Sequence, residues 1–379
     1  MLTALVNGRI LAGERIVSGV TVLLSQGRIE GVLPAADPRC RDAVTVDLEG
    51  HILLPGFIDV QVNGGGGVLF NDDPSLESIR AIGAAHRRFG TTGFLPTLIS
   101  DDLDTIGQAI AAVQSSLEAG LPGPLGIHIE GPFLNWARRG VHDPKHLRRL
   151  DNGVISLLCS LRGGRTVLTL APEMTTTAMI AQLAASGILI SAGHSDANFA
   201  QTSAAIAHGV RGFTHLFNAM APLAPREPGI VGAALFDANT WCGIIVDGHH
   251  VDPVMLKLAL RCKRHDKFML VTDAMPPVGS PEPSFVLQGR TIHVKDGVCR
   301  DENGTLAGTG LDMATAVRNA VSLLGLEIAE AARMASEYPA AFLGLDHELG
   351  RIAPGYRANL ALLDDDLRVK RTWIEGIAS

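Results

Sequence analysis

Apolar runs and amphipathic stretches alternate through the middle of the chain. From Leu54 onwards, short apolar runs predict buried strands, and stretches with apolar residues at three- and four-residue spacing predict helices. The predicted strands are 54–62, 92–95, 125–129, 166–170, 187–191, 210–214, 242–246 and 268–272. The predicted helices are 76–89, 103–118, 176–185, 197–207 and 253–264. About eight strand–helix units over roughly 290 residues fit an α/β fold of the (β/α)8, TIM-like barrel type.

A doubly wound open sheet is the alternative fold. Such a sheet normally carries a glycine-rich phosphate turn between its first strand and a helix. Four glycines follow the first predicted strand at 64–67, but they fit neither the GxGxxG nor the GxxxxGK pattern. We therefore favour the barrel and expect these glycines to form a flexible loop on its rim.

The two ends of the chain have a different pattern. Residues 1–53 and 350–379 consist of short predicted strands with tight turns, such as the one at Asn7-Gly8. Two independent terminal domains are disfavoured, because each end alone has too few strands for a core. We predict that both ends form one small β-sandwich domain, and that the barrel spans 54–349. A β-excursion is expected at about 276–308, before the last barrel helix.

Composition narrows the class of protein. Of the 379 residues 46% are hydrophobic but only 4% aromatic, which favours an aliphatic α/β interior. The net charge of −7 argues against nucleic acid or anionic membranes as partners. No apolar run reaches membrane-spanning length, and the N-terminus lacks a signal-peptide pattern. The five scattered cysteines favour reduced thiols. We therefore expect a cytoplasmic protein.

Two histidines follow successive predicted strands. His194 comes after strand 187–191, and His215 comes after strand 210–214. Parallel neighbouring strands place both residues on one rim of a barrel, where active sites are built. Glu130, which ends the third predicted strand, reaches the same rim. The three side chains offer one oxygen and two nitrogens, a set that suits Zn²⁺ or another first-row divalent ion and leaves a position for water. The alternative is that both histidines lie in loops and form hydrogen bonds with backbone groups.

Two further side chains belong to this rim. Asp273 ends the last predicted strand, where it can take a proton from water and return it to a leaving group. Its alternatives are a helix cap or a partner for a lysine. His128 lies two residues before Glu130 and so shares its strand face. We favour a supporting role for His128 over that of a further metal ligand.

The segments that carry a family resemblance are, in order, PGFIDVQVNGGGG, HIEGPFLN, GHSDA, THLFNAM, PREPG, VDGHHVD, VTDAM and GTLAGTGLDM. Together, in order and over almost the whole chain, they resemble the N-acetylglucosamine-6-phosphate deacetylases of the amidohydrolase superfamily. The resemblance implies a (β/α)8 barrel with a small β-domain made from both termini. It also implies hydrolysis of the acetamide of N-acetyl-D-glucosamine 6-phosphate, which gives D-glucosamine 6-phosphate and acetate.

The resemblance assigns catalytic roles to single residues. Glu130, His194 and His215 are the implied ligands of one divalent ion per subunit, with Zn²⁺ the first candidate. Asp273 is the implied acid/base. His142, in the loop after the third strand, is implied to polarise the carbonyl.

The resemblance also implies how the substrate binds. Arg226 and His250 are expected to hold the phosphate. In relatives an arginine at this position comes from a neighbouring subunit, so we expect a homodimer with Arg226 near its interface. His249 is expected to be a loop histidine. The residues expected to line the sugar site are Val141, His142, Ala219, Met220, Leu306, Ala307 and Gly308.

The first strand departs from the pattern of many amidohydrolases. Where many members carry His-x-His and bind two metals, this chain has Gln61-Val62-Asn63. Amides are poorer ligands than imidazole for these ions. We therefore expect a single metal, with Gln61 and Asn63 as hydrogen-bonding groups in the pocket.

Two alternatives for the function remain open at this point. The same site could act on the galactosamine epimer or on a cyclic amide, although Arg226 and His250 favour a phosphorylated substrate. A non-catalytic scaffold would have lost metal ligands or the acid/base, and all of these are present in the sequence.

Overall fold

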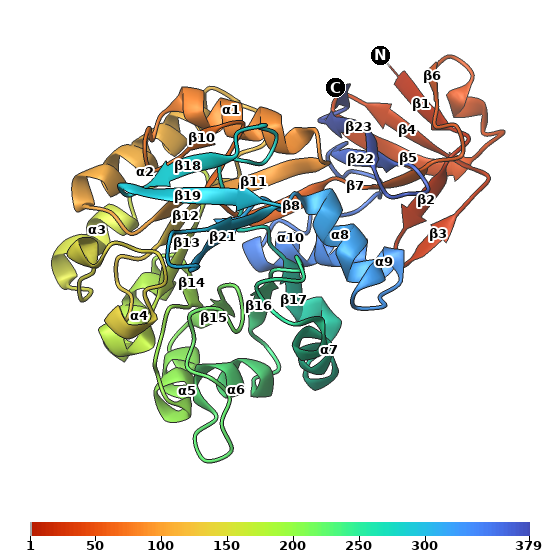
Figure 1. Cartoon of the computed structure of the whole chain (residues 1–379). Coiled ribbons are helices and arrows are strands. Elements are labelled where there is room, and N and C mark those ends of the chain that lie inside the picture. Colours follow the sequence, from red (N-terminus) through yellow and green to blue (C-terminus); the bar gives the residue numbers. More distant parts are fainter. Residues whose placement is uncertain (1) are drawn as a thin grey trace.

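The computed structural model describes residues 2–379 and contains a barrel of parallel strands surrounded by helices (Figure 1). The barrel strands, in the order in which they pair, are β8 (Phe57–Val62), β11 (Thr91–Ile99), β12 (Gly126–Glu130), β13 (Arg165–Leu170), β14 (Leu189–Ala192), β15 (Val210–Phe213), β16 (Trp241–Ile244) and β17 (Phe268–Leu270). The ring closes where Val62, at the end of β8, pairs with Ala274 beyond β17. The predicted (β/α)8 barrel is confirmed.

Ten α-helices are present in the described residues. They are α1 (Leu76–Arg87), α2 (Leu103–Glu118), α3 (Asn152–Leu158), α4 (Thr177–Ala185), α5 (Phe199–Ala207), α6 (Gly229–Phe236), α7 (Pro253–Cys262), α8 (Met313–Ser322), α9 (Ile328–Met334) and α10 (Glu337–Leu343). The predicted ranges match α1, α2, α4, α5 and α7. The other five helices had no predicted range; α6, for example, was missed because its sequence GIVGAALF is apolar all round and has no helical period. None of the helices in residues 2–379 is long and apolar enough to cross a membrane.

The first predicted strand, 54–62, is wrong as a single element. It is divided at Gly56 into β7 (Ile52–Pro55) and β8. A Cβ atom at Gly56 would lie 2.3 Å from the Thr92 side chain, so only glycine lets the chain pass from one sheet to the other here. β7 pairs with β22 (Leu360–Leu363) in the small domain, whereas β8 opens the barrel.

Both ends of the chain build the small β-sandwich, as predicted. One sheet consists of β5 (Arg28–Pro34), β4 (Val20–Ser25), β1 (Leu2–Val6) and β6 (Val44–Asp47). The other consists of β24 (Ile377–Ala378), β23 (Val369–Ile374), β22, β7, β2 (Arg9–Ala12) and β3 (Arg15–Val17). Buried side chains from both ends, including Leu5, Val22 and Trp373, form its core. The domain limits at residues 53 and 350 stay a prediction.

Two smaller β-elements lie at the barrel mouth. The excursion is a four-stranded antiparallel sheet, the β-insert, made of β18 (Ser284–Leu287), β19 (Arg290–Lys295), β20 (Val298–Arg300) and β21 (Leu306–Thr309). The glycine loop forms a hairpin of β9 (Gly64–Gly65) and β10 (Val68–Leu69), held by hydrogen bonds from Gly64 N to Ala274 O and from His86 to Gly64 O. It is a packed hairpin and not the free loop expected from sequence.

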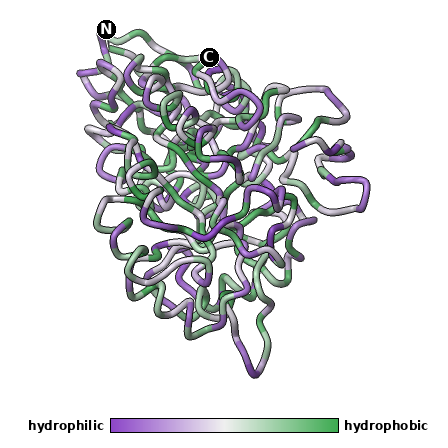
Figure 2. The backbone as a smooth tube through the Cα atoms, turned by 90° about the vertical axis from the view of Figure 1, so that its left-hand side faces the viewer, coloured by the Kyte–Doolittle hydropathy of each residue, from purple (hydrophilic) through white to green (hydrophobic). Residues whose placement is uncertain are grey.

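The main hydrophobic core lies inside the barrel and between its strands and helices. It consists of Ile, Leu, Val and Ala with a few Phe side chains, as the low aromatic content indicates. Figure 2 shows hydrophobic segments in the centre of the molecule and hydrophilic segments in many outer loops. This aliphatic core fixes the strands, and their carboxyl ends therefore hold the polar side chains of the mouth in place.

Candidate active site

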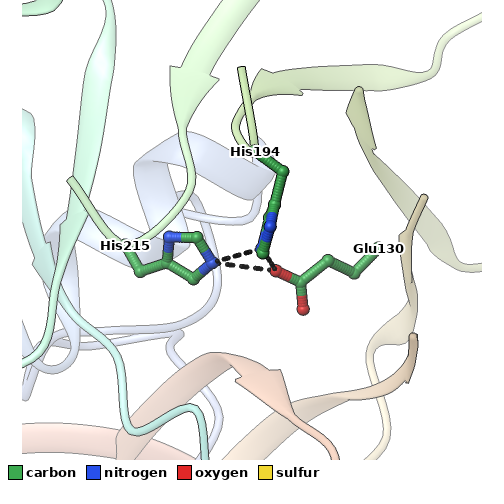
Figure 3. A group of neighbouring side chains, drawn as sticks. All are labelled: Glu130, His194 and His215. Carbon is green, nitrogen blue, oxygen red and sulfur yellow. Dashed lines mark hydrogen bonds and ion pairs between the residues drawn. The ribbon is translucent and has the colours of Figure 1, made fainter. Parts of the chain in front are cut away.

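The predicted metal ligands meet at the mouth of the barrel (Figure 3). Glu130 is the last residue of β12, and His194 and His215 each lie two residues beyond a neighbouring strand. One ligand atom from each residue lies within 4.8 Å of the others. Glu130 Oε1 is 3.2 Å from His194 Nε2 and 3.0 Å from His215 Nε2, and the two imidazole nitrogens are 3.0 Å apart.

The backbone turns sharply at three of the mouth residues. His194, His215 and Asp273 have φ angles of 47°, 33° and 52°, in the left-handed region. Each such residue costs about 1–3 kcal/mol and persists only where its surroundings hold it. Backbone hydrogen bonds to neighbouring strands hold these residues in place. Leu216 N, for example, donates to Gly243 O at 2.8 Å. The turn lets each side chain point across the mouth and not along its strand.

The three residues fit a single divalent ion. His194 Nδ1 donates to Arg138 O at 2.9 Å, which leaves Nε2 free as a ligand. Burial disfavours charge on Glu130 and His215, yet contacts with His194 and His215 lower the pKa of Glu130 well below its usual value, and the contact with Glu130 raises the pKa of His215. Two nitrogens and one oxygen that converge in a buried space suit a first-row divalent cation with an open position.

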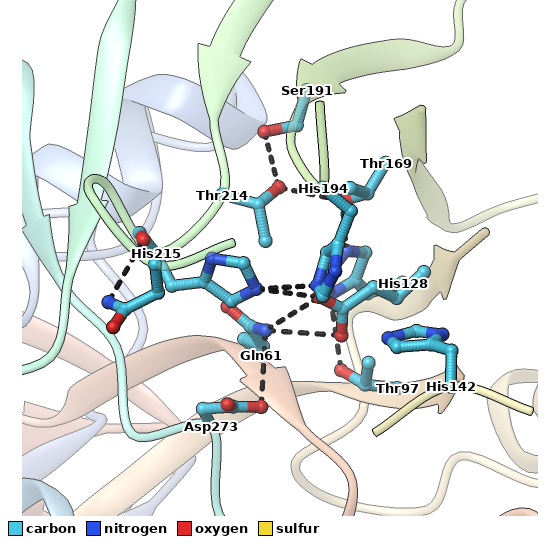
Figure 4. A network of polar contacts seen from close by, with 12 residues as sticks. Gln61, Thr97, His128, His142, Thr169, Ser191, His194, Thr214, His215 and Asp273 are labelled. Carbon is cyan, nitrogen blue, oxygen red and sulfur yellow. Dashed lines mark hydrogen bonds and ion pairs between the residues drawn. The ribbon is translucent and has the colours of Figure 1, made fainter. Parts of the chain in front are cut away.

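Asp273 lies beside this ligand group with two amide partners. Its carboxylate accepts hydrogen bonds from Asn63 Nδ2 at 2.7 Å and from Gln61 Nε2 at 3.2 Å. The Gln61 amide also lies 3.2 Å from Glu130 Oε2, so it links the predicted acid/base to a predicted metal ligand (Figure 4). Burial, followed by the negative charge of Glu130, raises the pKa of Asp273 to about 6. A pKa near neutrality suits a group that takes up and returns a proton.

His142 is held as a neutral hydrogen-bond donor. Its Nδ1 accepts from Ser100 N at 3.2 Å and lies 2.7 Å from Ser100 Oγ. Because a backbone N–H points at Nδ1, the ring proton is on Nε2. Burial, followed by the charge of His194, lowers the pKa of His142 to about 3. The ring packs edge-on against His194 with centroids 4.6 Å apart, which places this N–H donor beside the ligand group.

A layer of hydroxyl groups lies beneath the ligands. His128 contacts Thr97 Oγ1 at 3.2 Å and Thr169 Oγ1 at 2.7 Å, and the chain of contacts continues through Thr214 to Ser191 (Figure 4). With both ring nitrogens engaged, His128 supports the floor of the site and is not in the ligand group. Burial lowers its pKa to about 4, so the ring is neutral at physiological pH.

A cavity of about 450 Å³ opens above the ligands, which is large enough for a sugar phosphate. Of the residues expected at the substrate, those that line the cavity are Asn63, Val141, His142, Ala219, His250, Leu306 and Gly308. Four others lie elsewhere. Gln61 lies below the cavity against Glu130, Met220 packs in the barrel core, Ala307 packs in the core of the β-insert, and Arg226 lies in an exposed loop before α6.

His250 is oriented by a residue that the sequence did not indicate. Asp247 Oδ2 lies 2.6 Å from His250 Nδ1, so the other ring nitrogen is free to face a ligand. Burial raises the pKa of Asp247, but the hydrogen bond and charge of His250, together with the backbone N–H groups of His250 and His249, outweigh burial and lower the pKa to about 2. His249, which was predicted to be a loop histidine, lies in the loop before α7 and is exposed.

Sequence reasoning also missed several cavity residues, among them Arg138 and Asn218. Arg138 lines the cavity and forms an ion pair with Asp196 at 2.9 Å. Asn218 lines the cavity and donates to His215 O at 3.1 Å. The signal for Asn218 was present, because it lies three residues after a predicted ligand. Arg138 has no comparable signal, because it is one of several charged residues in its loop and nothing in the sequence sets it apart.

A buried group of residues that could hold a divalent ion, with a carboxylate of near-neutral pKa and a neutral imidazole beside it at the mouth of a (β/α)8 barrel, is the arrangement of a metal-dependent hydrolase. The model of the Amidohydrolase family matches residues 52–378, and the chain belongs to this family.

Named relatives agree with this assignment. The chain is 47% identical over 330 residues to the N-acetylgalactosamine-6-phosphate deacetylase of Shewanella sp. (strain ANA-3). The aligned region covers 87% of this chain and 83% of that protein. It is 36% identical over 379 residues to the N-acetylglucosamine-6-phosphate deacetylase of Haemophilus influenzae, with 99% of both covered. The crystal structure of N-acetylglucosamine-6-phosphate deacetylase from Pasteurella multocida matches with a TM-score of 0.96 at 36% identity, over the full length of both chains.

Proposed function

We propose that the chain removes the acetyl group from N-acetyl-D-glucosamine 6-phosphate and gives D-glucosamine 6-phosphate and acetate. The observation that carries this proposal is one buried mouth where the ligand set, Asp273 and the His142 N–H surround a single cavity. The full-length relative from Haemophilus influenzae and the structure from Pasteurella multocida, both named for this reaction, support the substrate.

Glu130, His194 and His215 would hold the divalent ion, and we propose Zn²⁺ because it accepts this mixed set of nitrogen and oxygen ligands. When bound, such an ion acidifies a water molecule and polarises an amide carbonyl. Asp273 takes the proton from the attacking water and later returns it to the departing amine. His142 donates its Nε2–H to the carbonyl oxygen as negative charge develops there. Asn63 and Gln61 keep the Asp273 carboxylate turned towards the ligand group.

We propose that the phosphate is held by His250 within the subunit and by Arg226 from a second subunit. Arg226 is exposed in its own chain, on a loop that also carries the exposed Leu223. Next to this loop, α6 and α7 present large apolar side chains to solvent, with Phe236 81% exposed and Val254 61% exposed. A homodimer that covers this apolar face would bring Arg226 to the partner's site.

Arg226→Ala is expected to raise the KM for the 6-phosphate by about 10- to 100-fold, because a charge-assisted contact to phosphate is lost. The KM for unphosphorylated N-acetyl-D-glucosamine should stay within about twofold, since that sugar offers nothing to the guanidinium. Steady-state acetate release with both sugars measures the difference. Arg264→Ala, at another exposed arginine, is the control. An equal effect of Arg226→Ala on both sugars would rule out the phosphate role.

Mixing Arg226→Ala with an Asp273→Asn variant tests the second subunit directly. In a mixed dimer, one site receives Arg226 from one chain and Asp273 from the other. Random exchange should restore about a quarter of the wild-type sites. Activity that does not rise above the sum of the separate variants, although mixed dimers are present by mass, would place Arg226 outside the shared site.

A second candidate substrate is the 4-epimer, N-acetyl-D-galactosamine 6-phosphate. The relative from Shewanella, which is 47% identical, is named for this sugar and favours it. The test is acetate release from each 6-phosphate by purified protein, before and after chelation and Zn²⁺ restoration. We expect metal-dependent release, with a higher kcat/KM for the glucosamine compound. A higher value for the galactosamine compound would reassign the substrate, and no release from either would refute the proposed reaction.

We also propose that the protein works in the cytoplasm. The five cysteines are free thiols, and two of them, Cys242 and Cys299, are buried. Burial raises the pKa of the Cys242 thiol to about 11, so it stays protonated and unreactive. This is the thiol usage expected in a reducing compartment.

A further inference from the structure

One side chain of the β-insert reaches the segment that carries His142. Gln288 lies in the turn between β18 and β19, and its neighbour Leu287 lines the substrate cavity. Gln288 Nε2 donates to Ser100 O at 2.8 Å, and Gln288 Oε1 accepts from Asp143 N at 2.8 Å. Both partners are backbone groups of fixed polarity, so the orientation of this amide is determined.

These two contacts close a ring of hydrogen bonds around His142. Ser100, which accepts from Gln288, is the residue whose N–H and hydroxyl hold His142 Nδ1. Asp143, which donates to Gln288, follows His142 directly in the chain. A single amide therefore ties the backbone that carries the imidazole to the backbone that orients it.

A second residue of the same hairpin fastens the same segment. Arg290 donates to Val141 O, on the other side of His142. Its guanidinium also lies 3.7 Å from the buried Asp301 carboxylate, which keeps the arginine within the β-insert. The backbone on both sides of His142 is thus held from the β-insert and not only from the barrel.

We propose that Gln288 is a positioning residue that sets the direction of the His142 Nε2–H towards the reacting carbonyl. This inference rests on the proposed deacetylation, in which His142 is the donor to the developing oxyanion. Such a donor acts only when it is aligned, and a displacement of about 1 Å can cost about 10²-fold in rate. The β-insert is then part of the catalytic apparatus as well as a wall of the cavity.

Gln288→Asn separates positioning from folding. Gln288 has a φ of 48° and is followed by Gly289 at 80°, a turn in which asparagine is favoured. The variant therefore keeps the turn, but its side chain is one methylene shorter and cannot span Ser100 and Asp143. We expect kcat for acetate release to fall about 10-fold, with KM within about twofold. The two lost hydrogen bonds should lower the Tm modestly, and the variant should remain folded because the turn is kept.

The matched control is Gln26→Asn in the small domain. Gln26 has a φ of 49° and is followed by Gly27 at 77°, so the same substitution occurs in the same kind of turn, away from the barrel mouth. We expect its kcat to match the wild type. A Gln288→Asn variant with wild-type kcat would overturn the proposal.

A double-mutant cycle tests whether Gln288 acts through His142. In a His142→Gln background, Gln288→Asn should change kcat by less than about twofold, because the group that it positions is gone. An undiminished loss of about 10-fold in that background would show that Gln288 acts by another route, and would overturn the proposal.

The state of the His142 ring gives a readout that does not depend on activity. In ¹⁵N-histidine-labelled protein, with the signal assigned by its loss in His142→Gln, the wild type should show a bare Nδ1 and a protonated Nε2. Gln288→Asn should give a mixture of the two tautomers, whereas Gln26→Asn should not. An unchanged tautomer in Gln288→Asn would overturn the positioning role. If the wild type released no acetate, the proposed function would fail, and the ring signals would still decide whether Gln288 holds His142.

Discussion

Asp273→Asn is expected to lower kcat for acetate release by about 10³- to 10⁴-fold, the contribution of a well-placed general acid/base. Asparagine keeps the shape and can still contact Gln61 and Asn63, but it cannot accept the proton of the attacking water. KM should change little, because Asp273 acts on the proton and not on the sugar or phosphate. Steady-state acetate release measures the loss, and bound metal per subunit should equal that of the wild type.

The pH dependence of the wild type follows from the same group. Asp273 works as a base only when deprotonated, and burial raises its pKa to about 6. kcat/KM should therefore fall about tenfold per pH unit below this pKa and be level above it. The positive charge of a bound ion lowers the pKa of Asp273, so the acidic side of this pH profile moves to lower pH. An Asp273→Asn variant that kept more than about a tenth of the wild-type kcat, or showed the same acidic limb, would exclude Asp273 as the acid/base.

His215→Gln is expected to abolish both stoichiometric metal binding and acetate release. It removes one of the three proposed ligands and leaves an amide, which binds these ions poorly. The loss in metal affinity should exceed the roughly 10- to 100-fold that follows from removing a residue that only supports a ligand. Metal titration of chelated protein, followed by ion content and activity, makes the measurement.

Thermal unfolding tests metal binding by the His215→Gln variant independently of activity. A ligand that binds only the folded state adds about 2.7 kcal/mol at one hundred times its Kd, so Zn²⁺ should raise the Tm of chelated wild type. His215→Gln should not respond at that concentration, whereas His249→Gln, at an exposed histidine, should respond as the wild type does. A His215→Gln variant with wild-type metal content would place the ion elsewhere.

The barrel and its ligand group could be predicted from the sequence because both depend on short-range patterns. Apolar runs mark buried strands, and the polar residue that follows each run is bound to lie at the mouth. Glu130, His194 and His215 were found in this way, and the structure brings them together. Gly56 was not found as a strand break, because its reason is contact with Thr92, thirty-six residues away, and such a contact leaves no local pattern.

The parts of the site that escaped prediction depend on side-chain direction. Met220 and Ala307 lie in segments that reach the cavity, yet their side chains point into cores, and only the neighbouring Ala219, Leu306 and Gly308 line the space. The resemblance indicated segments that line the cavity, but it could not tell which side chains point inward. The contacts of Gln288 escaped for a related reason, since they join backbone atoms of distant loops.

The pairing of β7 with β22 has a consequence for the order in which the protein is made. Leu54 pairs with Ala361, so the six-stranded sheet joins segments at opposite ends of the chain. Contacts between such distant segments form slowly, and a ribosome delivers the chain from its N-terminus. Until residues 360–374 have emerged, β7 has an unpaired edge, even after all eight barrel strands have been made. The nascent chain therefore carries an exposed strand, open to pairing with other chains, through most of its synthesis.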